Sequence, residues 1–360
     1  MRVAPAVSVA AMFDTPAYAA ESPRAPLAPF SVQRREPGPR DVAIEILYCG
    51  VCHSDIHQAR AEWGEAIFPM VPGHEIVGRV AQVGGEVTRW RVGDTVGVGC
   101  FVDSCRECEA CGAGEEQYCA DGMTLTYNGR ERGSAAPTYG GYSTRITVDQ
   151  DYVVRVPEGI PLARAAPLLC AGITTYSPLK HFGLARGDEL AVVGLGGLGH
   201  VAVKIGAAMG ARVTVLSHSP GKREDALALG ATGFIATSDP AVFAAHAGRF
   251  DMILDTISAA HDYDAYLRLL RRDGTMVLVG MPEPCTLAAG SLVIGRKRLA
   301  GSLIGGIRET QEMLDFCAAH QIAADVEVID IAEINAAYER MLRSDVRYRF
   351  VIDIASLAAR

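Results

Sequence analysis

The 360-residue sequence lacks an apolar run long enough to cross a membrane, and it lacks an excess of basic residues. Its most apolar stretch, 189–209, is interrupted by His200, Lys204 and several glycines, whereas a membrane-spanning helix needs about 20 mostly apolar residues. With 34 Lys and Arg against 42 Asp and Glu, the net charge is −8, so no basic surface for nucleic-acid phosphates or anionic lipid is expected. We therefore expect neither a membrane nor a nucleic-acid partner.

The composition also argues against a disordered or disulfide-stapled protein. Hydrophobic residues make up 49% and charged residues 21% of a chain that is long enough for two domains. The apolar segment 6–13 lacks the basic flank of a signal peptide, because only Arg2 precedes it and Asp14 follows it. The ten cysteines cluster with the spacing of metal ligands, which must stay reduced. We expect a cytoplasmic protein.

The pattern of apolar residues and glycines changes along the chain. Residues 41–156 contain short Val-, Ile- and Tyr-rich runs separated by glycines, which predicts an all-β, partly barrel-like domain. From about residue 167 onward, apolar strands alternate with helices, which predicts a parallel α/β arrangement. Strands are expected at 44–48, 189–194, 212–216, 250–257, 275–280, 299–304 and 349–354, and helices at 198–209, 308–320 and 332–343.

One loop carries four cysteines with the spacing C-x2-C-x2-C-x7-C: Cys105, Cys108, Cys111 and Cys119. Four thiolates can form a closed tetrahedral zinc site. Because so polar a loop has little apolar surface to bury, metal binding would stabilise its fold instead. A closed shell has no open position, so we predict a structural zinc site. The alternative is a redox-active or metal-free thiol cluster. The other four, which lie outside both metal-ligand sets, are interpreted as core thiols: Cys49, Cys100, Cys285 and Cys317.

A second ligand set is dispersed along the chain. Cys52 and His74 lie in polar turns after apolar segments, and Cys170 lies far away in an apolar segment. Three such ligands leave room for water or substrate, as in catalytic zinc sites, and Glu75 is a possible fourth. Taken singly, Cys170 could be a core cysteine and His74 a turn histidine, so the prediction depends on their combination.

A glycine-rich turn joins an expected strand to an expected helix. Its members are Gly194, Leu195, Gly196, Gly197, Leu198 and Gly199. In this context glycine lets the backbone approach a pyrophosphate at the helix N-terminus, which predicts dinucleotide binding. A simple packing turn is the alternative.

The end of the next strand indicates which dinucleotide is used. The position that holds an acidic residue in NAD-binding folds is Ser217 here. Hydroxyl, imidazole and cationic side chains surround it instead: His218, Ser219, Lys222 and Arg223. These groups favour the 2′-phosphate of NADPH over NADH, although a solvated helix start is the alternative reading.

These features together resemble the zinc-containing medium-chain alcohol dehydrogenases. The nearest likeness is to the cinnamyl-alcohol-dehydrogenase branch and its bacterial NADPH-dependent aldehyde reductases. It extends from about residue 33 to 353 and rests on CGVCHSDIHQ (49–58), VPGHEIVG (71–78), LLCAGIT (168–174) and DVRYRFV (345–351). The resemblance implies an α/β enzyme with a GroES-like β domain, formed by 1–170 and 307–360, and a doubly wound Rossmann domain at 171–306.

The resemblance also implies individual roles. Cys52, His74 and Cys170 hold the catalytic zinc, with Glu75 a fourth ligand or a nearby exchanging group, and Asp55 accepts a hydrogen bond from the zinc-bound histidine. Ser54 donates the proton to the product oxygen, and His57 links it to solvent. Further implied positions are His53 and Arg349 for the pyrophosphate, Thr174 near the nicotinamide, and Trp63 as an aromatic wall of the substrate pocket.

The implied activity is hydride transfer between NADPH and an aldehyde, with aromatic and medium-chain substrates favoured and two zinc ions per chain. A homodimer joined along the strand expected at 299–304 is also implied. The alternative is a non-catalytic NADPH-binding redox sensor or structural protein on the same fold. The joint presence of Cys52, His74, Cys170, Ser54 and His57 argues for the enzyme.

Overall fold

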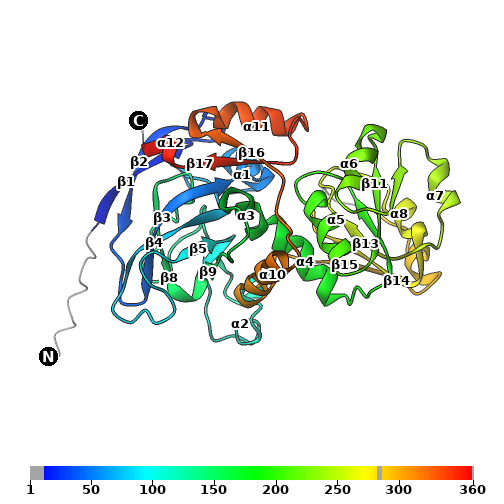
Figure 1. Ribbon diagram of the computed structural model, residues 1–360, viewed down its shortest axis with the longest axis horizontal. Helices are drawn as coiled ribbons and strands as arrows, with labels where there is room; N and C mark the ends of the chain where they lie inside the picture. The colour runs from blue at the N-terminus through cyan, green and yellow to red at the C-terminus, as the bar shows by residue number, and fades with distance from the viewer. Residues whose placement is uncertain (1–11, 282–285, 359–360) are drawn as a thin grey trace.

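The computed structural model describes residues 12–281 and 286–358, which form two sheets side by side with helices α4 (Ala171–His181) and α10 (Ile307–Ala319) between them (Figure 1). The first sheet lies in the half that contains both ends of the described chain. The second lies in the half built from the middle of the chain. No helix in these described ranges is long and apolar enough to cross a membrane.

The first half is mostly antiparallel. Its seven-stranded sheet has the order β16-β17-β3-β4-β5-β9, with β8 paired to β3. These strands are β3 (Asp41–Gly50), β4 (Ile76–Val83), β5 (Thr95–Val98), β8 (Arg145–Asp149), β9 (Val154–Arg155), β16 (Val326–Asp330) and β17 (Arg349–Asp353). Two small ribbons complete the strands: β1 (Met12–Ala19) with β2 (Ala28–Arg35), and β6 (Phe101–Asp103) with β7 (Thr124–Leu125). The helices are α1 (His53–Ala59), α2 (Glu109–Ala113), α3 (Leu162–Ala165), α11 (Ile334–Leu342) and α12 (Ala355–Ala358).

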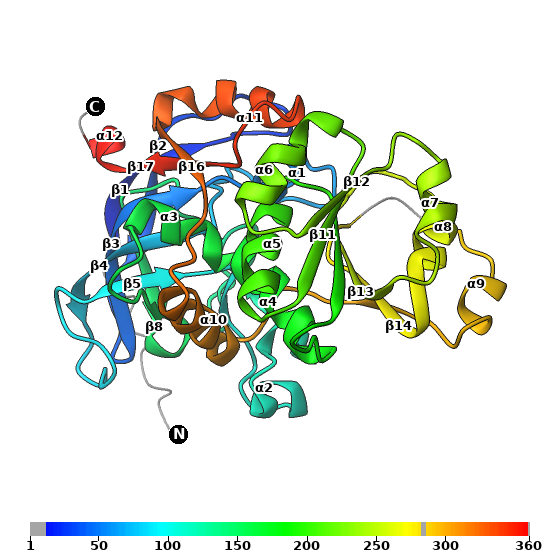
Figure 2. The same cartoon turned by 45° about the vertical axis from the view of Figure 1, so that its right-hand side comes forward.

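The second half is a parallel six-stranded sheet in the order β12-β11-β10-β13-β14-β15. Its strands are β10 (Glu189–Val193), β11 (Arg212–Ser217), β12 (Gly233–Ala236), β13 (Phe250–Asp255), β14 (Leu270–Leu278) and β15 (Arg298–Gly301). The helices are α5 (Gly199–Ala208), α6 (Arg223–Ala228), α7 (Ala241–Ala245), α8 (Tyr263–Leu269) and α9 (Gly290–Val293). Figure 2 shows α4, α5 and α6 in front of this sheet. Parallel strands buried on both faces explain the continuous apolar runs at β10 and β13.

The expected α/β class with a parallel sheet is confirmed. The expected strands and helices differ from those observed at their ends, and several elements were not predicted, among them β1, β2, β12, β16 and α4. The strand expected at 299–304 ends at Gly301. The Ser302 amide still donates to the Leu278 carbonyl at 3.1 Å, whereas the Leu303 amide donates to the Tyr118 hydroxyl at 3.1 Å. β14 begins five residues earlier than expected, at Leu270. The helix expected from 332 begins at Ile334, after a short 3-10 turn at Ile331–Glu333. The domain boundaries at 170 and 306 stay a prediction.

Candidate metal centres and coenzyme turn

Four buried metal-ligand side chains meet although they come from three distant segments. Cys52 precedes α1, His74 and Glu75 precede β4, and Cys170 precedes α4. One ligand atom of each lies within 4.8 Å of all the others, and the two sulfur atoms are 3.9 Å apart. The structure therefore brings together all four residues of the dispersed set.

The carboxylate of Glu75 has two different surroundings. One oxygen is paired with the guanidinium of Arg349, and the other, Oε2, is buried without a hydrogen-bond partner in the described chain. Gly50 lies directly against this carboxylate, where a Cβ atom would collide with Oε2. A buried, unpaired carboxylate oxygen beside two thiols and an imidazole fits a divalent cation.

Asp55 is fully buried behind this cluster and accepts four hydrogen bonds. One oxygen accepts from His74 Nδ1 at 3.1 Å and from the Gly73 amide at 3.2 Å. The other accepts from the Cys52 amide at 2.8 Å and from the Tyr142 hydroxyl at 3.2 Å. The carboxylate thus fixes the ring of His74 so that its second nitrogen faces the thiols, as expected for a metal ligand. Tyr142 was not predicted, because nothing in its sequence context distinguishes it from a core tyrosine.

The electrostatics of the cluster favour a deprotonated thiol. A hydrogen bond from Cys170 and the charge of Arg349 lower the pKa of Cys52 well below its usual value, although burial opposes the shift. Burial also opposes a charged His74, but the neighbouring Asp55 carboxylate raises its pKa well above normal. A thiolate and a histidine that attracts positive charge form a site that a metal cation can occupy in place of the proton.

The residues expected to move a proton lie at the start of α1. The Ser54 hydroxyl is 3.6 Å from the Cys52 sulfur, so it adjoins the cluster. His57 is one turn further, and its Nδ1 lies 2.6 Å from the Glu62 carboxylate. Trp63 stacks on the His57 ring at a centroid distance of 4.9 Å and is 43% exposed, and its place in the substrate pocket stays a prediction. Glu62 was missed because its position relative to His57 depends on the turn after α1.

The interpretation of the remaining cysteines as core thiols needs a correction. Cys49 and Cys317 are fully buried, as expected. Cys100 is only partly buried: it packs against the hydrophobic core, but its thiol also interacts with that of Cys170, so it borders the metal-ligand cluster as well. This second contact was not predicted because it depends on the turn after β5 meeting the segment before α4. Cys285 lies outside the described residues.

The local cysteine set also forms one group. The sulfur atoms of Cys105, Cys108, Cys111 and Cys119 all lie within 4.8 Å of one another. Amide donors, first that of Ala120, lower the pKa of Cys108 to about 6, which favours the thiolate that a metal needs.

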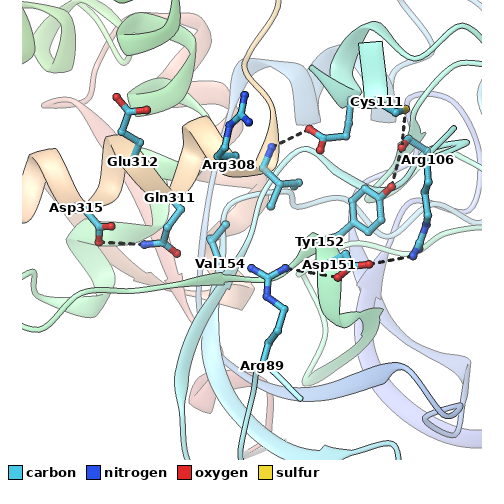
Figure 3. Close-up of a pocket in the computed structure, with 13 residues that line it drawn as sticks. Arg89, Arg106, Cys111, Asp151, Tyr152, Val154, Arg308, Gln311, Glu312 and Asp315 are labelled. Carbon is cyan, nitrogen blue, oxygen red and sulfur yellow. Dashed lines mark hydrogen bonds and ion pairs between the residues drawn. The ribbon is translucent and has the colours of Figure 1, made fainter. Parts of the chain in front are cut away.

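A cavity of about 610 Å³ lies beside this group, between the cysteine loop and α10 (Figure 3). Cys111 reaches its wall, where Ser104 lies 3.1 Å from the Cys111 sulfur and 2.7 Å from the Tyr152 hydroxyl. Paired charges line the rest, including Arg106 and Asp151. None of its lining residues belongs to the Cys52 cluster, so this cavity is not the reaction site.

The glycine turn connects β10 to α5, and its position links it to the Cys52 cluster. A Cβ atom at Gly197 would lie 2.8 Å from the side chain of Arg349, so glycine permits their close contact. The Arg349 guanidinium is also 3.8 Å from the Cys52 sulfur. The expected dinucleotide turn and metal cluster therefore share one arginine.

The residues expected around the 2′-phosphate follow β11. Ser217 is nearly buried and accepts from the Ser219 amide at 3.3 Å, whereas His218 and Ser219 are exposed. Lys222 donates to the Leu195 carbonyl of the glycine turn at 2.8 Å. Arg223 instead lies over the Phe234 ring, at 5.2 Å. Lys222 is thus beside the turn, and Arg223 is directed elsewhere.

The other positions implied for the coenzyme flank these groups. Thr174 is buried in the first turn of α4, where its amide donates to Cys170, and His53 is exposed at the start of α1. The backbone donors at Gly194, Gly196, Leu198 and Gly199 lie at the junction of β10 and α5.

Comparison with known proteins bears on both the fold and the cluster. Residues 38–158 match the family described as Alcohol dehydrogenase GroES-like domain, and residues 197–319 match Zinc-binding dehydrogenase. NADP-dependent alcohol dehydrogenase C 1 of Mycolicibacterium smegmatis is 58% identical over 96% of this chain and 99% of its own. This chain belongs to the zinc-containing medium-chain alcohol dehydrogenases.

Two further relatives show to which branch of the family the chain is similar. The aldehyde reductase YahK of Escherichia coli is 54% identical to this dehydrogenase over 95% of the chain and 98% of its own. The structure of CAD from Helicobacter pylori complexed with NADP(H) superposes with a TM-score of 0.90 at 42% identity, covering 96% and 99% of the two chains. The dehydrogenase thus has a GroES-like part and a Rossmann-type part, and the predicted family and branch are confirmed.

Proposed function

We propose that this dehydrogenase transfers hydride between NADPH and an aldehyde at the Cys52 cluster, reducing aromatic and medium-chain aldehydes in preference to short ones. The observation that carries the proposal is the meeting of two thiols, an imidazole and a half-paired carboxylate in one buried group. When bound, zinc supplies the Lewis acid that polarises a carbonyl group, and NADPH supplies the hydride.

The side chains of the protein have separate tasks in this reaction. Asp55 holds the His74 ring in one orientation through Nδ1. Ser54 donates the proton that the product alcohol needs, because its hydroxyl lies beside the cluster. His57 then returns a proton to Ser54 from solvent, and Glu62 orients its ring through Nδ1. Burial of the four ligands keeps bulk water from the cluster.

The glycine turn and the N-terminus of α5 would hold the pyrophosphate of the coenzyme, and Ser217 and Lys222 would contact its 2′-phosphate. The absence of an acid at Ser217 and the position of Lys222 against Leu195 support NADPH. The structure supports a weaker part for Arg223, since its guanidinium packs on Phe234.

A second zinc ion, at the four-cysteine group, has a structural role. Its support is the closed set of four sulfur atoms in a loop with little buried surface. The loop holds the first turn of α10, because Glu116 accepts from the Ile307 amide at 3.1 Å and Arg308 donates to the Ala113 carbonyl at 2.6 Å. Losing this metal loosens the connection between the two sheets.

The protein forms a homodimer through the edge of its Rossmann-type sheet and works in the cytoplasm. β15 lies at the end of the strand order, and apolar side chains nearby are exposed: Met281, Val293, Ile294 and Leu303. An open strand edge with apolar neighbours favours pairing with a second copy. Light scattering of the purified protein measures its molar mass and so tests whether it is a dimer.

The experiment that tests the function is NADPH oxidation with a panel of aldehydes, before and after zinc is removed. Benzaldehyde, hexanal and acetaldehyde serve as substrates. We expect faster turnover of benzaldehyde and hexanal than of acetaldehyde. Chelation should abolish turnover and added zinc should restore it. Turnover that survives complete removal of zinc contradicts the proposed role of the metal. Binding of NADPH without any turnover contradicts the proposal and favours a binding protein.

A further inference from the structure

His200 has no role in the proposed chemistry, yet it is completely buried where the two halves of the molecule meet. It is the second residue of α5, directly after the glycine turn. Its ring lies between that turn and the segment around Asp325 and Tyr348, which leads into the β16 and β17 strands of the other sheet. A buried imidazole in this place connects elements of different sheets.

The hydrogen bonds of His200 define one tautomer. The amide of Asp325 can only donate, and it lies 3.2 Å from Nε2, so Nε2 accepts. Nδ1 lies 3.1 Å from the Gly196 carbonyl, which can only accept, so Nδ1 carries the proton and donates. A neutral ring satisfies both neighbours, and burial, helped by the Lys204 charge, lowers its pKa to about 4.

The neighbours of His200 on the first sheet's side are themselves fixed. The Tyr348 ring stacks on the imidazole at a centroid distance of 4.8 Å and an angle of 15°. The Asp325 carboxylate is held by Lys204 Nζ at 2.9 Å and by Arg164 at 2.6 Å. The Asp325 carbonyl accepts from the Tyr348 amide at 3.0 Å. The imidazole therefore joins the glycine turn to a rigid partner.

The other side of the turn touches the Cys52 cluster through Arg349. Gly197 lies against the Arg349 side chain, which pairs with Glu75. Two contacts thus tie adjacent glycines to the same half of the molecule: Gly196 through His200 and Gly197 through Arg349. Their combination sets the distance between the turn and the metal ligands.

We infer that His200 is a positioning residue for the dinucleotide, which fixes the glycine turn, and with it the pyrophosphate, relative to the metal cluster. The inference rests on the proposed function, because the turn is taken to bind NADPH. Hydride transfer requires the nicotinamide to lie within a fraction of an ångström of its reacting position, so a shift of the turn is costly.

Equilibrium binding of NADPH, followed by its fluorescence, tests the inference with three variants. His200→Phe keeps a flat ring for Tyr348 but removes both hydrogen bonds, and we expect Kd to rise about tenfold or more. His200→Asn can keep the donor to Gly196, and His200→Gln can keep the acceptor for Asp325. The Kd of each variant for NADPH should therefore lie between that of His200→Phe and that of the wild type. The KM for NADPH should rise more than kcat falls.

Arg212→Met is the matched control, because it removes an exposed ion pair with Glu189 in the same half of the molecule, at the opposite end of β10 from the glycine turn. We expect its Kd to stay within about twofold of the wild type. Zinc content should be equal in all variants. If the Phe variant does not fold, the Kd values of the Asn and Gln variants for NADPH test the inference instead.

Three results would overturn the inference: a Kd for His200→Phe equal to the wild type, an equal rise in Arg212→Met, or no partial rescue in both Asn and Gln. A wild-type protein that fails to bind NADPH would instead overturn the proposed function. Binding to the wild type therefore separates the two failures.

Discussion

The guanidinium of Arg349 is paired with the carboxylate of Glu75, and both side chains are almost completely buried. One residue comes from β17 near the end of the chain and the other from the segment before β4. The pair connects the glycine turn, which touches Arg349, with the ligand set that contains Glu75. Glu75 can therefore face Arg349 or a metal ion, and the arginine balances its charge in the first case.

Arg349→Met should strongly destabilise the protein, because it leaves the buried charge of Glu75 without its partner. The expected loss in the free energy of unfolding is about 3–5 kcal/mol, measured by urea denaturation of the zinc-free protein. Arg347→Met is the matched control two residues away, since Arg347 pairs with Asp225 at 3.3 Å but is 74% exposed. It should cost about 1 kcal/mol or less. Equal losses in the two variants would contradict the account.

The coenzyme preference depends on the end of β11. The wild type should favour NADPH over NADH in kcat/KM by roughly tenfold to several hundredfold, since each charge-assisted bond to the 2′-phosphate contributes about 1.5–3 kcal/mol. Ser217→Asp should reverse much of this preference by repelling the phosphate. Lys222→Gln should weaken NADPH use more than Arg223→Gln, because Arg223 is engaged with Phe234. Comparable values for both coenzymes in the wild type would refute the assignment.

Trp63 and His57 form a stacked pair, so a change at Trp63 affects both substrate and proton transfer. Trp63→Ala should raise KM for benzaldehyde more than for hexanal, because a flat aryl group loses its stacking surface. It should also lower kcat for both, because His57 loses its support. Trp63→Phe retains a flat ring and should stay near the wild type. An unchanged substrate ranking in Trp63→Ala would show that this side chain is not part of the pocket.

His200 makes the stability of the protein depend on pH. Burial lowers its pKa to about 4, whereas an unfolded chain takes up the proton near pH 6.5. Stability is therefore lost as the pH falls from about 6.5 to 4, by at most roughly 3 kcal/mol. The difference in unfolding free energy between the wild type and His200→Asn should shrink over this range. A difference that is independent of pH would argue that the ring is not held neutral.

Some of this architecture could be predicted from the sequence because it is local. The spacing of Cys105, Cys108, Cys111 and Cys119 lies within one loop, and the glycine turn follows directly on its strand. Cys170 was a candidate only in combination with Cys52 and His74, and the family resemblance strengthened it, since no short-range pattern links it to Cys52, 118 residues earlier.

Apart from the local contact of Glu62 with His57, the contacts that were missed join separate elements. The Tyr142 hydroxyl reaches Asp55 across 87 residues, and the Asp325 amide reaches His200 across 125. Cys100 meets Cys170 only because the turn after β5 lies against the segment before α4. Such pairs depend on strand register and on how the two halves dock, which residue patterns along one chain do not encode.

Metal content measured together with turnover tests the central claim most directly. We predict two zinc ions per chain in the wild type and one in Cys52→Ser, which should retain its fold but lose NADPH-dependent aldehyde reduction. Cys108→Ser should instead lose the other zinc ion and unfold at a lower temperature. A wild-type protein with a single zinc ion or none, or a Cys52→Ser variant that keeps its turnover, would contradict the account.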